Sequence, residues 1–111
     1  MAEPPDAVAA TAAAIPGLPQ EVTARLLAVL SAEPAVQEVW LYGSRAMGRH
    51  RPGSDIDITL VAPDLRHHDR LRLMAALDDL LLPWSIDLSL KHELPDSLRD
   101  HVARVGRRLA L

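Results

Sequence analysis

The chain of 111 residues has no cysteine and no phenylalanine, and aromatic residues make up only 3% of it. Without cysteine it can form neither a disulfide nor a thiolate metal site, which is compatible with a reducing cytoplasm. So few aromatic rings leave no stacking platform for single-stranded nucleic acid. A net charge of −3 and a pI near 5.9 also argue against direct nucleic-acid binding, which normally needs a basic surface.

No apolar run is long enough to span a membrane, so we expect no membrane contact. The Ala- and Pro-rich start carries acids in place of the basic region of a secretory signal, and a cytoplasmic protein is therefore expected. Residues 1–17 are predicted to form a poorly ordered arm. Residues 18–111 suffice for one domain with a single core, built from Leu, Val, Ile and Ala.

Hydrophobic periodicity and turn residues predict alternating helices and strands after the arm. Helices are expected at residues 19–32, directly after Gly43-Ser44, at 67–82 and at 95–105, the last closed by Gly106. Strands are expected at residues 35–43, 55–62 and 85–90, with 107–111 as a short edge strand.

The strands at 55–62 and 85–90 each alternate apolar and polar side chains, so one face of the sheet should be open. Helices should cover the other face, which predicts a two-layer α/β domain. The helix at 67–82 should bury a stripe that ends at Leu80 and Leu81. Trp40 and Trp84 border apolar strands and are expected in the core. The five histidines show no metal-ligand spacing and are expected at the surface.

Three aspartates fall on the open face. Asp55 and Asp57 project together because side chains two residues apart on a strand share a face. If the strand at 85–90 pairs alongside, Asp87 joins them across the ladder. Neighbouring carboxylates repel unless a cation lies between them, and Mg²⁺, or Mn²⁺ in its place, suits oxygen ligands without His or Cys. A solvated strand face is the plain alternative; it suffices for Asp87 alone but fits the Asp-x-Asp pair less well, because acids are depleted in strands.

Gly43 and Ser44 end one predicted strand and begin a helix, and free backbone N–H groups at such a turn attract phosphate. A serine-capped turn is common by itself, so it indicates phosphate binding only in combination with the acids. Three arginines in the following loop, Arg45, Arg49 and Arg51, could pair with a triphosphate or remain solvated.

The combined pattern, G-S-x10-D-x-D with a further aspartate on the next strand, resembles the DNA polymerase beta-like nucleotidyltransferase superfamily. Within it, "YGSRAMGRHRPGSDIDITLV" is similar to the minimal nucleotidyltransferases encoded beside HEPN-domain proteins. The resemblance runs from about Leu18 to Leu111, the expected extent of the domain. It implies a small mixed sheet with helices on one face and an open catalytic face.

By this resemblance, Gly43 and Ser44 hold the triphosphate of ATP. Asp55 and Asp57 ligate the metal ions, and Asp87 binds the second ion or helps to deprotonate the attacking hydroxyl.

Two further positions also match the family. Arg49 lies nearest to its basic loop position. Ser54 corresponds to the serine of its SD-x-D form, where it would orient the loop or the carboxylate.

The resemblance further implies an antitoxin that transfers AMP from ATP to a tyrosine of a HEPN ribonuclease toxin. An antitoxin that blocks the HEPN partner by occlusion, without catalysis, is the alternative from another class, and a small-molecule nucleotidyltransferase is the third. The complete set of acids favours the enzyme, because occlusion needs no clustered carboxylates.

Overall fold

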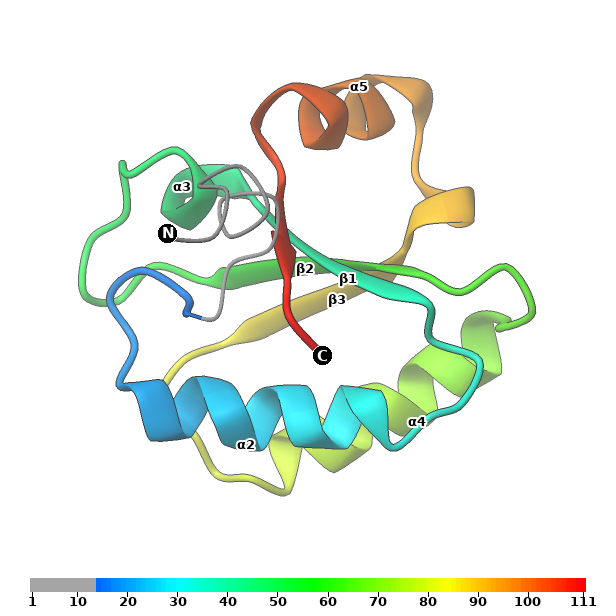
Figure 1. Cartoon of the computed structure of the whole chain (residues 1–111), viewed down its shortest axis with the longest axis horizontal. Helices are drawn as coiled ribbons and strands as arrows, with labels where there is room; N and C mark the ends of the chain where they lie inside the picture. Colours follow the sequence, from blue (N-terminus) through cyan, green and yellow to red (C-terminus); the bar gives the residue numbers. More distant parts are fainter. Residues whose placement is uncertain (1–13) are drawn as a thin grey trace, which may run out of the picture.

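The computed structural model describes residues 14–111, and the part of the expected arm at residues 1–13 lies outside this range. Helices and strands alternate in the predicted order (Figure 1). The helices are α2 (Gln20–Ser31), α3 (Gly43–Ala46), α4 (His67–Asp78) and α5 (Asp96–Val105), with a short 3-10 helix, η1 (Lys91–Glu93). The strands are β1 (Glu38–Tyr42), β2 (Ile56–Val61), β3 (Ile86–Leu90) and β4 (Arg107–Leu109).

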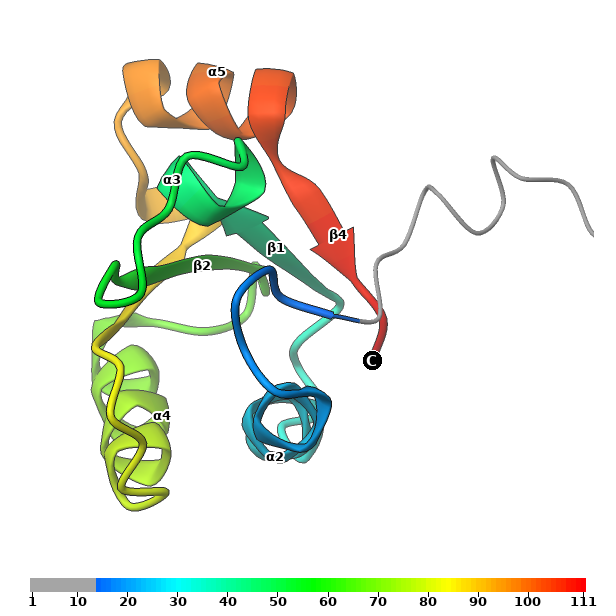
Figure 2. The same ribbon diagram turned by 90° about the vertical axis from the view of Figure 1, so that its left-hand side faces the viewer.

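The four strands form one mixed sheet in the order β3-β2-β1-β4. β1 is antiparallel to both β2 and β4, whereas β2 and β3 are parallel and are connected through α4. Helices α2 and α4 cover one face of the sheet, and α3 and α5 lie on its other side (Figures 1 and 2). The predicted α/β arrangement around a small mixed sheet is confirmed, and α3 and α5 additionally cover part of the second face.

The hydrophobic core lies between the sheet and the α2–α4 layer. Alternation along each strand turns one row of aliphatic side chains toward these helices. The helices pack leucines and valines against this row at helical spacing. The central members are Val39, Leu41, Ile56, Ile58, Leu60, Leu88 and Leu90 from the strands, with Leu26, Leu30, Leu73 and Leu77 from the helices. As the composition predicts, the core cluster within residues 14–111 is aliphatic, and the partly buried Trp84 packs at its edge.

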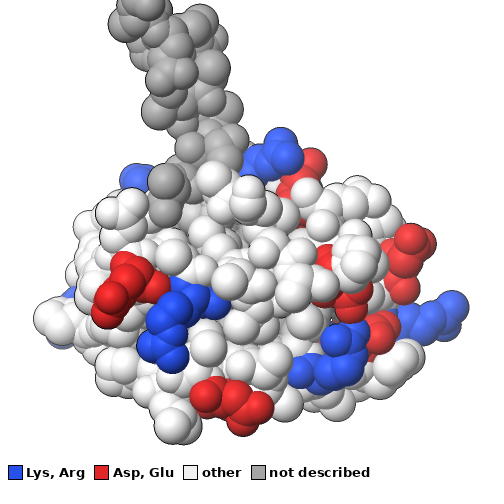
Figure 3. Space-filling model, turned by 60° about the horizontal axis from the view of Figure 1, so that its bottom comes forward, with Lys and Arg blue, Asp and Glu red and all other residues white. Residues whose placement is uncertain are grey.

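The surface over α2 and α4 carries acidic and basic side chains side by side (Figure 3). On α4, Arg72 contacts Glu33, which lies just after α2, at 2.6 Å, and this pair bridges the two helices. No helix of residues 14–111 has the length and apolar character that crossing a membrane requires.

Helix α4 ends at Asp78, earlier than predicted, and Leu81 is 88% exposed, so its expected place in the buried stripe is wrong. The backbone of Leu81 has a φ of 55°, which turns the chain out of the helical path. Leu80 remains packed against the core. The apolar periodicity of "LDDLLL" therefore continues one turn beyond the helix that it predicts.

Gly106 follows α5 as predicted, but its φ of −62° is one that any residue can adopt. The reason for glycine is steric, because a Cβ there would overlap the Val102 carbonyl oxygen and crowd the Trp40 ring. The chain passes directly from α5 into β4 at this point.

Residues 14–17, which the sequence assigns to the arm, are packed against the fold. Ile15 is 1% exposed and belongs to the core, and the Pro16 carbonyl accepts a hydrogen bond from Arg45. The folded part of the chain therefore begins before Leu18.

Candidate active site

Three polar side chains form a row across the sheet, on the face opposite the core. Tyr42 of β1 is the register partner of Asp57 of β2, and Asp57 is the partner of Asp87 of β3. Directly opposed residues of neighbouring strands have their Cβ atoms about 5 Å apart. The structure thus places Asp87 beside Asp57, as predicted, and adds Tyr42 to the same row.

Asp57 occupies the least favourable position for a negative charge in this row. Burial raises the pKa of its carboxyl above the usual value, and the negative charges of Asp87 and Asp55 raise the pKa further. His101 and Arg45 act in the opposite direction. The three aspartates are therefore close enough to repel one another, which is the arrangement that a bound cation would relieve.

Asp55 and Asp87 are exposed, whereas Asp57 is half-buried between them. Within residues 14–111, no three His, Cys, Asp or Glu side chains are gathered closely enough to hold a metal ion as they stand. The carboxylates nevertheless supply the oxygen ligands that Mg²⁺ prefers, on one face of the sheet and with mutual repulsion to offset. The donor set fits this ion, with phosphate oxygens of a nucleotide needed to complete its coordination.

Gly43 brings the predicted phosphate turn into contact with the acids. It is the first residue of α3, its φ is +73°, and a Cβ at this position would overlap the Asp57 carboxylate. Glycine is required here twice, for the backbone conformation and for the close approach. Ser44 follows within α3, one residue after the glycine that lies against Asp57.

Arg45 does not point to a phosphate site. Its side chain is 1% exposed, and its two terminal nitrogens donate to the carbonyl oxygens of Pro16 and Ser54, each at 2.8 Å. Gly17 passes so closely that a Cβ there would lie 2.6 Å from Arg45 Nη1. This buried cation ties the segment before α2 to the loop that carries the acids.

The loop between α3 and β2 contains the other two predicted ligands. Arg49 is exposed, and its backbone N–H donates to the Ser44 carbonyl at 2.8 Å. The Ser54 hydroxyl accepts from the Arg51 N–H at 2.8 Å, and its carbonyl accepts from Arg45. Ser54 therefore closes the loop directly before Asp55, in keeping with the orienting role that the SD-x-D form suggests.

Two residues of this face were not recognised in the sequence as part of the site. His101 of α5 packs edge-on against Tyr42, with the ring centroids 6.2 Å apart, and its charge lowers the pKa of Asp57. Burial raises the pKa of the Tyr42 hydroxyl, and the charges of Asp87 and Asp57 add to that rise. Tyr42 could have been found from the alternation along β1, but His101 reaches the site only through the docking of α5.

Residues 25–110 match the polymerase beta nucleotidyltransferase family, and the chain belongs to this family. No curated protein matches the sequence significantly.

The chain is also similar to several solved structures. A chain of a toxin–antitoxin complex with AMP-PNP is 28% identical, with a TM-score of 0.68 over 78% of this chain and 71% of that one. A chain of a complex between a tri-AMPylated HEPN toxin from Shewanella oneidensis and its MNT antitoxin is 26% identical, with a TM-score of 0.64 over 82% of this chain and 71% of that one. A minimal nucleotidyltransferase is 32% identical, with a TM-score of 0.61 over 83% of this chain and 94% of that one.

These comparisons confirm the polymerase beta-like fold and the resemblance to minimal nucleotidyltransferases. Antitoxins of the MntA–HepT type are among the structural neighbours.

Replacement of Asp57 by asparagine should stabilise the metal-free protein at neutral pH. The fold holds the pKa of this carboxyl above its value in the unfolded chain, so its ionisation destabilises the folded state as the pH rises through the folded pKa. Urea unfolding in EDTA should give a higher midpoint for Asp57→Asn than for the wild type near pH 7. The two midpoints should converge below the usual aspartate pKa of about 3.9.

Asp64→Asn is the matched control, because Asp64 is an exposed acid outside the row and should show no such pH-dependent difference. A clear loss of stability in Asp57→Asn at pH 7 would show instead that this carboxylate is a structural acid with buried partners.

Alanine at Gly43 and at Gly48 should separate backbone strain from damage to the site. Both glycines have a positive φ, +73° and +70°, so each substitution should cost about 1–2 kcal/mol of stability. Only at Gly43 would the new methyl group overlap Asp57, whereas nothing lies within 4 Å of a Cβ at Gly48. Titration with AMP-PNP in Mg²⁺ should show binding weakened about tenfold or more in Gly43→Ala and unchanged in Gly48→Ala. Equal affinities in the two variants would refute the proposed contact between the turn and the nucleotide site.

Proposed function

We propose that this protein is a metal-dependent antitoxin that transfers AMP from ATP to a tyrosine of a HEPN ribonuclease partner. The observation that carries the proposal is the contact of the Gly43 turn with Asp57, which lies in register with Asp87. A glycine turn against paired carboxylates suits a triphosphate whose charge is shared with a divalent cation. The similarity to chains of toxin–antitoxin complexes, one with AMP-PNP and one with a tri-AMPylated toxin, supports the choice of donor and acceptor.

The residues divide into a phosphate side and an acidic side. The backbone of Gly43 and the hydroxyl of Ser44 would hold the triphosphate at the end of β1, where the missing side chain lets the Asp57 carboxylate lie against the turn. Arg49 is free to pair with the same phosphates, since its side chain is exposed on the adjacent loop.

Asp55, Asp57 and Asp87 would hold Mg²⁺ or Mn²⁺, and the bound ion would supply charge neutralisation for the phosphates and the departing pyrophosphate. Of these three acids, Asp57 is half-buried and its side chain is held by the fold. The side chains of Asp55 and Asp87 are exposed and have room to move toward an ion.

The reaction forms a bond between the acceptor tyrosine oxygen and the α-phosphorus of ATP, and the bond from that phosphorus to pyrophosphate breaks. The tyrosine must lose its proton in this step. As the alternative to holding the second ion, Asp87 would accept this proton, because it is exposed and lies next to Asp57. Arg45, which is buried behind the loop, helps to keep Asp57 ionised.

The similarity to chains of toxin–antitoxin complexes favours a protein acceptor over a small molecule. With ATP as the donor, we expect the reaction in the cytoplasm. Simple occlusion of the partner remains the rival function, but it leaves the repulsion within the carboxylate row without a purpose.

The proposal predicts that incubation with the HEPN partner, ATP and Mg²⁺ increases the partner's mass by one or more AMP units on a tyrosine near its ribonuclease site. Asp55→Asn/Asp57→Asn should bind the partner but fail to modify it. Charge stabilisation of this kind contributes several kcal/mol to a barrier, so the rate should fall by orders of magnitude. Intact-mass spectrometry and co-purification measure the two properties separately.

Asp64→Asn/Asp79→Asn is the control, because it removes two exposed acids outside the site and should retain transfer. Full protection of cells by Asp55→Asn/Asp57→Asn, with no change in the toxin's mass, would reject the enzymatic proposal in favour of occlusion.

A further inference from the structure

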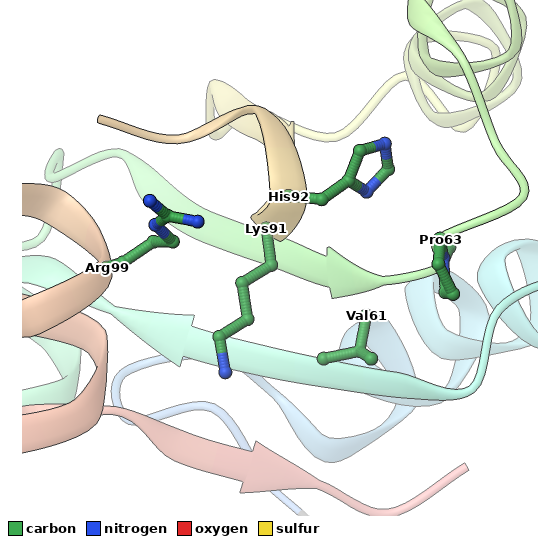
Figure 4. A pocket seen from close by; sticks show the side chains of 6 residues that line it. Val61, Pro63, Lys91, His92 and Arg99 are labelled. Carbon is green, nitrogen blue, oxygen red and sulfur yellow. The ribbon is translucent and has the colours of Figure 1, made fainter. Parts of the chain in front are cut away.

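A small pocket lies on the same face of the sheet as the carboxylate row, at the other end of β2. It is a cavity of about 230 Å³ whose apolar floor is formed by Val61, Ala62 and Pro63, at the end of the strand and just beyond it. Its other lining comes from Lys91 and His92 of η1 and from Arg99 of α5 (Figure 4). The proposed transfer reaction uses none of these residues.

The strand register fixes how far this pocket lies from the acids. Val61 follows Asp57 by four residues along β2, and Lys91 follows Asp87 by four residues, so all four positions belong to one face of the sheet. At about 3.3 Å per residue, the pocket begins about 13 Å from the carboxylate row. It is therefore a second contact site on this face, separate from the row.

The side chain of Lys91 reaches from the pocket toward the middle of the sheet. Its Nζ lies 6.0 Å from the centre of the Trp40 ring, and Trp40 is two residues from Tyr42 on the same face of β1. Trp40 thus lies on the face of the acids rather than in the core, where the sequence placed it. Figure 4 shows Lys91 and Arg99 reaching over the sheet from two different elements.

The two cations of the pocket remain available to a ligand. Within residues 14–111, Lys91 forms no ion pair, and Arg99 pairs only with Asp96 on the preceding turn of its own helix. A guanidinium has five N–H donors, so this single exposed pair leaves several of them free.

Glu38 is the acid that β1 places beside the pocket, because it is the register partner of Val61. Its carboxylate accepts the Trp40 N–H at 2.8 Å and lies 4.0 Å from Arg108, so it is held toward β4. The face is therefore acidic at the Asp57 end and basic at the Lys91 end.

This charge pattern indicates what the pocket can bind. Two cations from different elements, over an apolar floor, suit a carboxylate at the end of a short aliphatic side chain. We propose that the pocket binds an aspartate or glutamate of the acceptor protein and so positions the acceptor tyrosine at the carboxylate row. This inference rests on the proposed function, and it names the feature by which the acceptor is recognised.

The distance across the face sets where this acidic residue lies in the acceptor. In an extended segment, side chains four residues apart lie on the same side and about 13 Å from each other. This spacing equals the interval between the pocket and the row. The acceptor should therefore carry an aspartate or glutamate four residues from the tyrosine that is modified. Because the row is acidic and the pocket basic, the segment would be aligned with its acid away from the row.

Steady-state kinetics with the HEPN partner separate docking from chemistry. Lys91→Met/Arg99→Met keeps the apolar stems of both side chains but removes their charges. KM for the partner should rise about tenfold or more, while kcat stays within about twofold of the wild type and KM for ATP is unchanged. Arg104→Met/Arg107→Met is the matched control, because it removes two exposed cations outside the pocket and should leave all three values unchanged.

A charge swap tests the contact itself. Replacement of the partner's acid, four residues from the modified tyrosine, by lysine should raise KM for the partner with the wild type. Lys91→Glu/Arg99→Glu should lower it again, because opposite charges then face each other, whereas Arg104→Glu/Arg107→Glu should not. A partner without an acid at this spacing, an unchanged KM for the partner in Lys91→Met/Arg99→Met, or a raised KM for ATP would each overturn the proposal, while leaving the proposed transfer to tyrosine intact.

A binding measurement keeps the pocket distinct from the proposed function. The peptide Ac-Tyr-Ala-Ala-Ala-Glu-NH2, titrated without nucleotide, should bind the wild type about tenfold more tightly than the same peptide with glutamine in place of glutamate. The difference should disappear in Lys91→Met/Arg99→Met. Equal affinities of the wild type for the two peptides would overturn the pocket's role even if the partner is modified. If the peptides differ as expected but the partner gains no AMP, the proposed function fails and the binding of an acidic side chain in the pocket stands.

Discussion

The contact between Gly43 and the carboxylate of Asp57 depends on the strand register and brings the half-buried charge of Asp57 against the turn after β1. It joins the end of β1 to the start of β2, two segments that the loop between them separates by more than ten residues. The contact exists only because antiparallel pairing sets Tyr42 opposite Asp57 and the glycine next to it has no side chain. The register of the sheet thus brings the glycine turn and the Asp57 carboxylate together.

This arrangement keeps a charge in a half-buried position beside two others of the same sign, and the surrounding structure offsets the repulsion only in part. His101 of α5 and the buried guanidinium of Arg45 behind the loop both lower the pKa of Asp57. The aliphatic core between the sheet and helices α2 and α4 stabilises the domain by hydrophobic burial, because the charged row adds no stabilising free energy. The protein thus retains an electrostatically unfavourable row, which is characteristic of functional sites rather than of structural ones.

Much of this architecture follows from local patterns in the sequence. Alternation placed Asp55 and Asp57 on one face, because a period of two leaves no other choice. It placed Asp87 beside them only on the condition that the strand at 85–90 pairs alongside, which the structure shows. Leu81 shows the limit of periodicity. The apolar pattern continues after the helix has ended, and the left-handed backbone of this one residue turns the chain out of the helical path. The burial of Arg45 and the packing of His101 against Tyr42 depend on contacts between segments distant in the chain, which no local pattern reports. Trp40 was misplaced for a related reason, since a half-buried face under a helix has the same composition as a core.

The central claim is that the glycine turn and the aspartate row form one site in which a nucleotide and a divalent cation bind together. Calorimetric titration of the protein with ATP, first in Mg²⁺ and then in EDTA, tests this most directly. Because the phosphates complete the coordination of the metal and the metal offsets the repulsion of the acids, we expect affinity at least about tenfold higher in Mg²⁺ than in EDTA. Equal affinity in the two conditions would contradict this account.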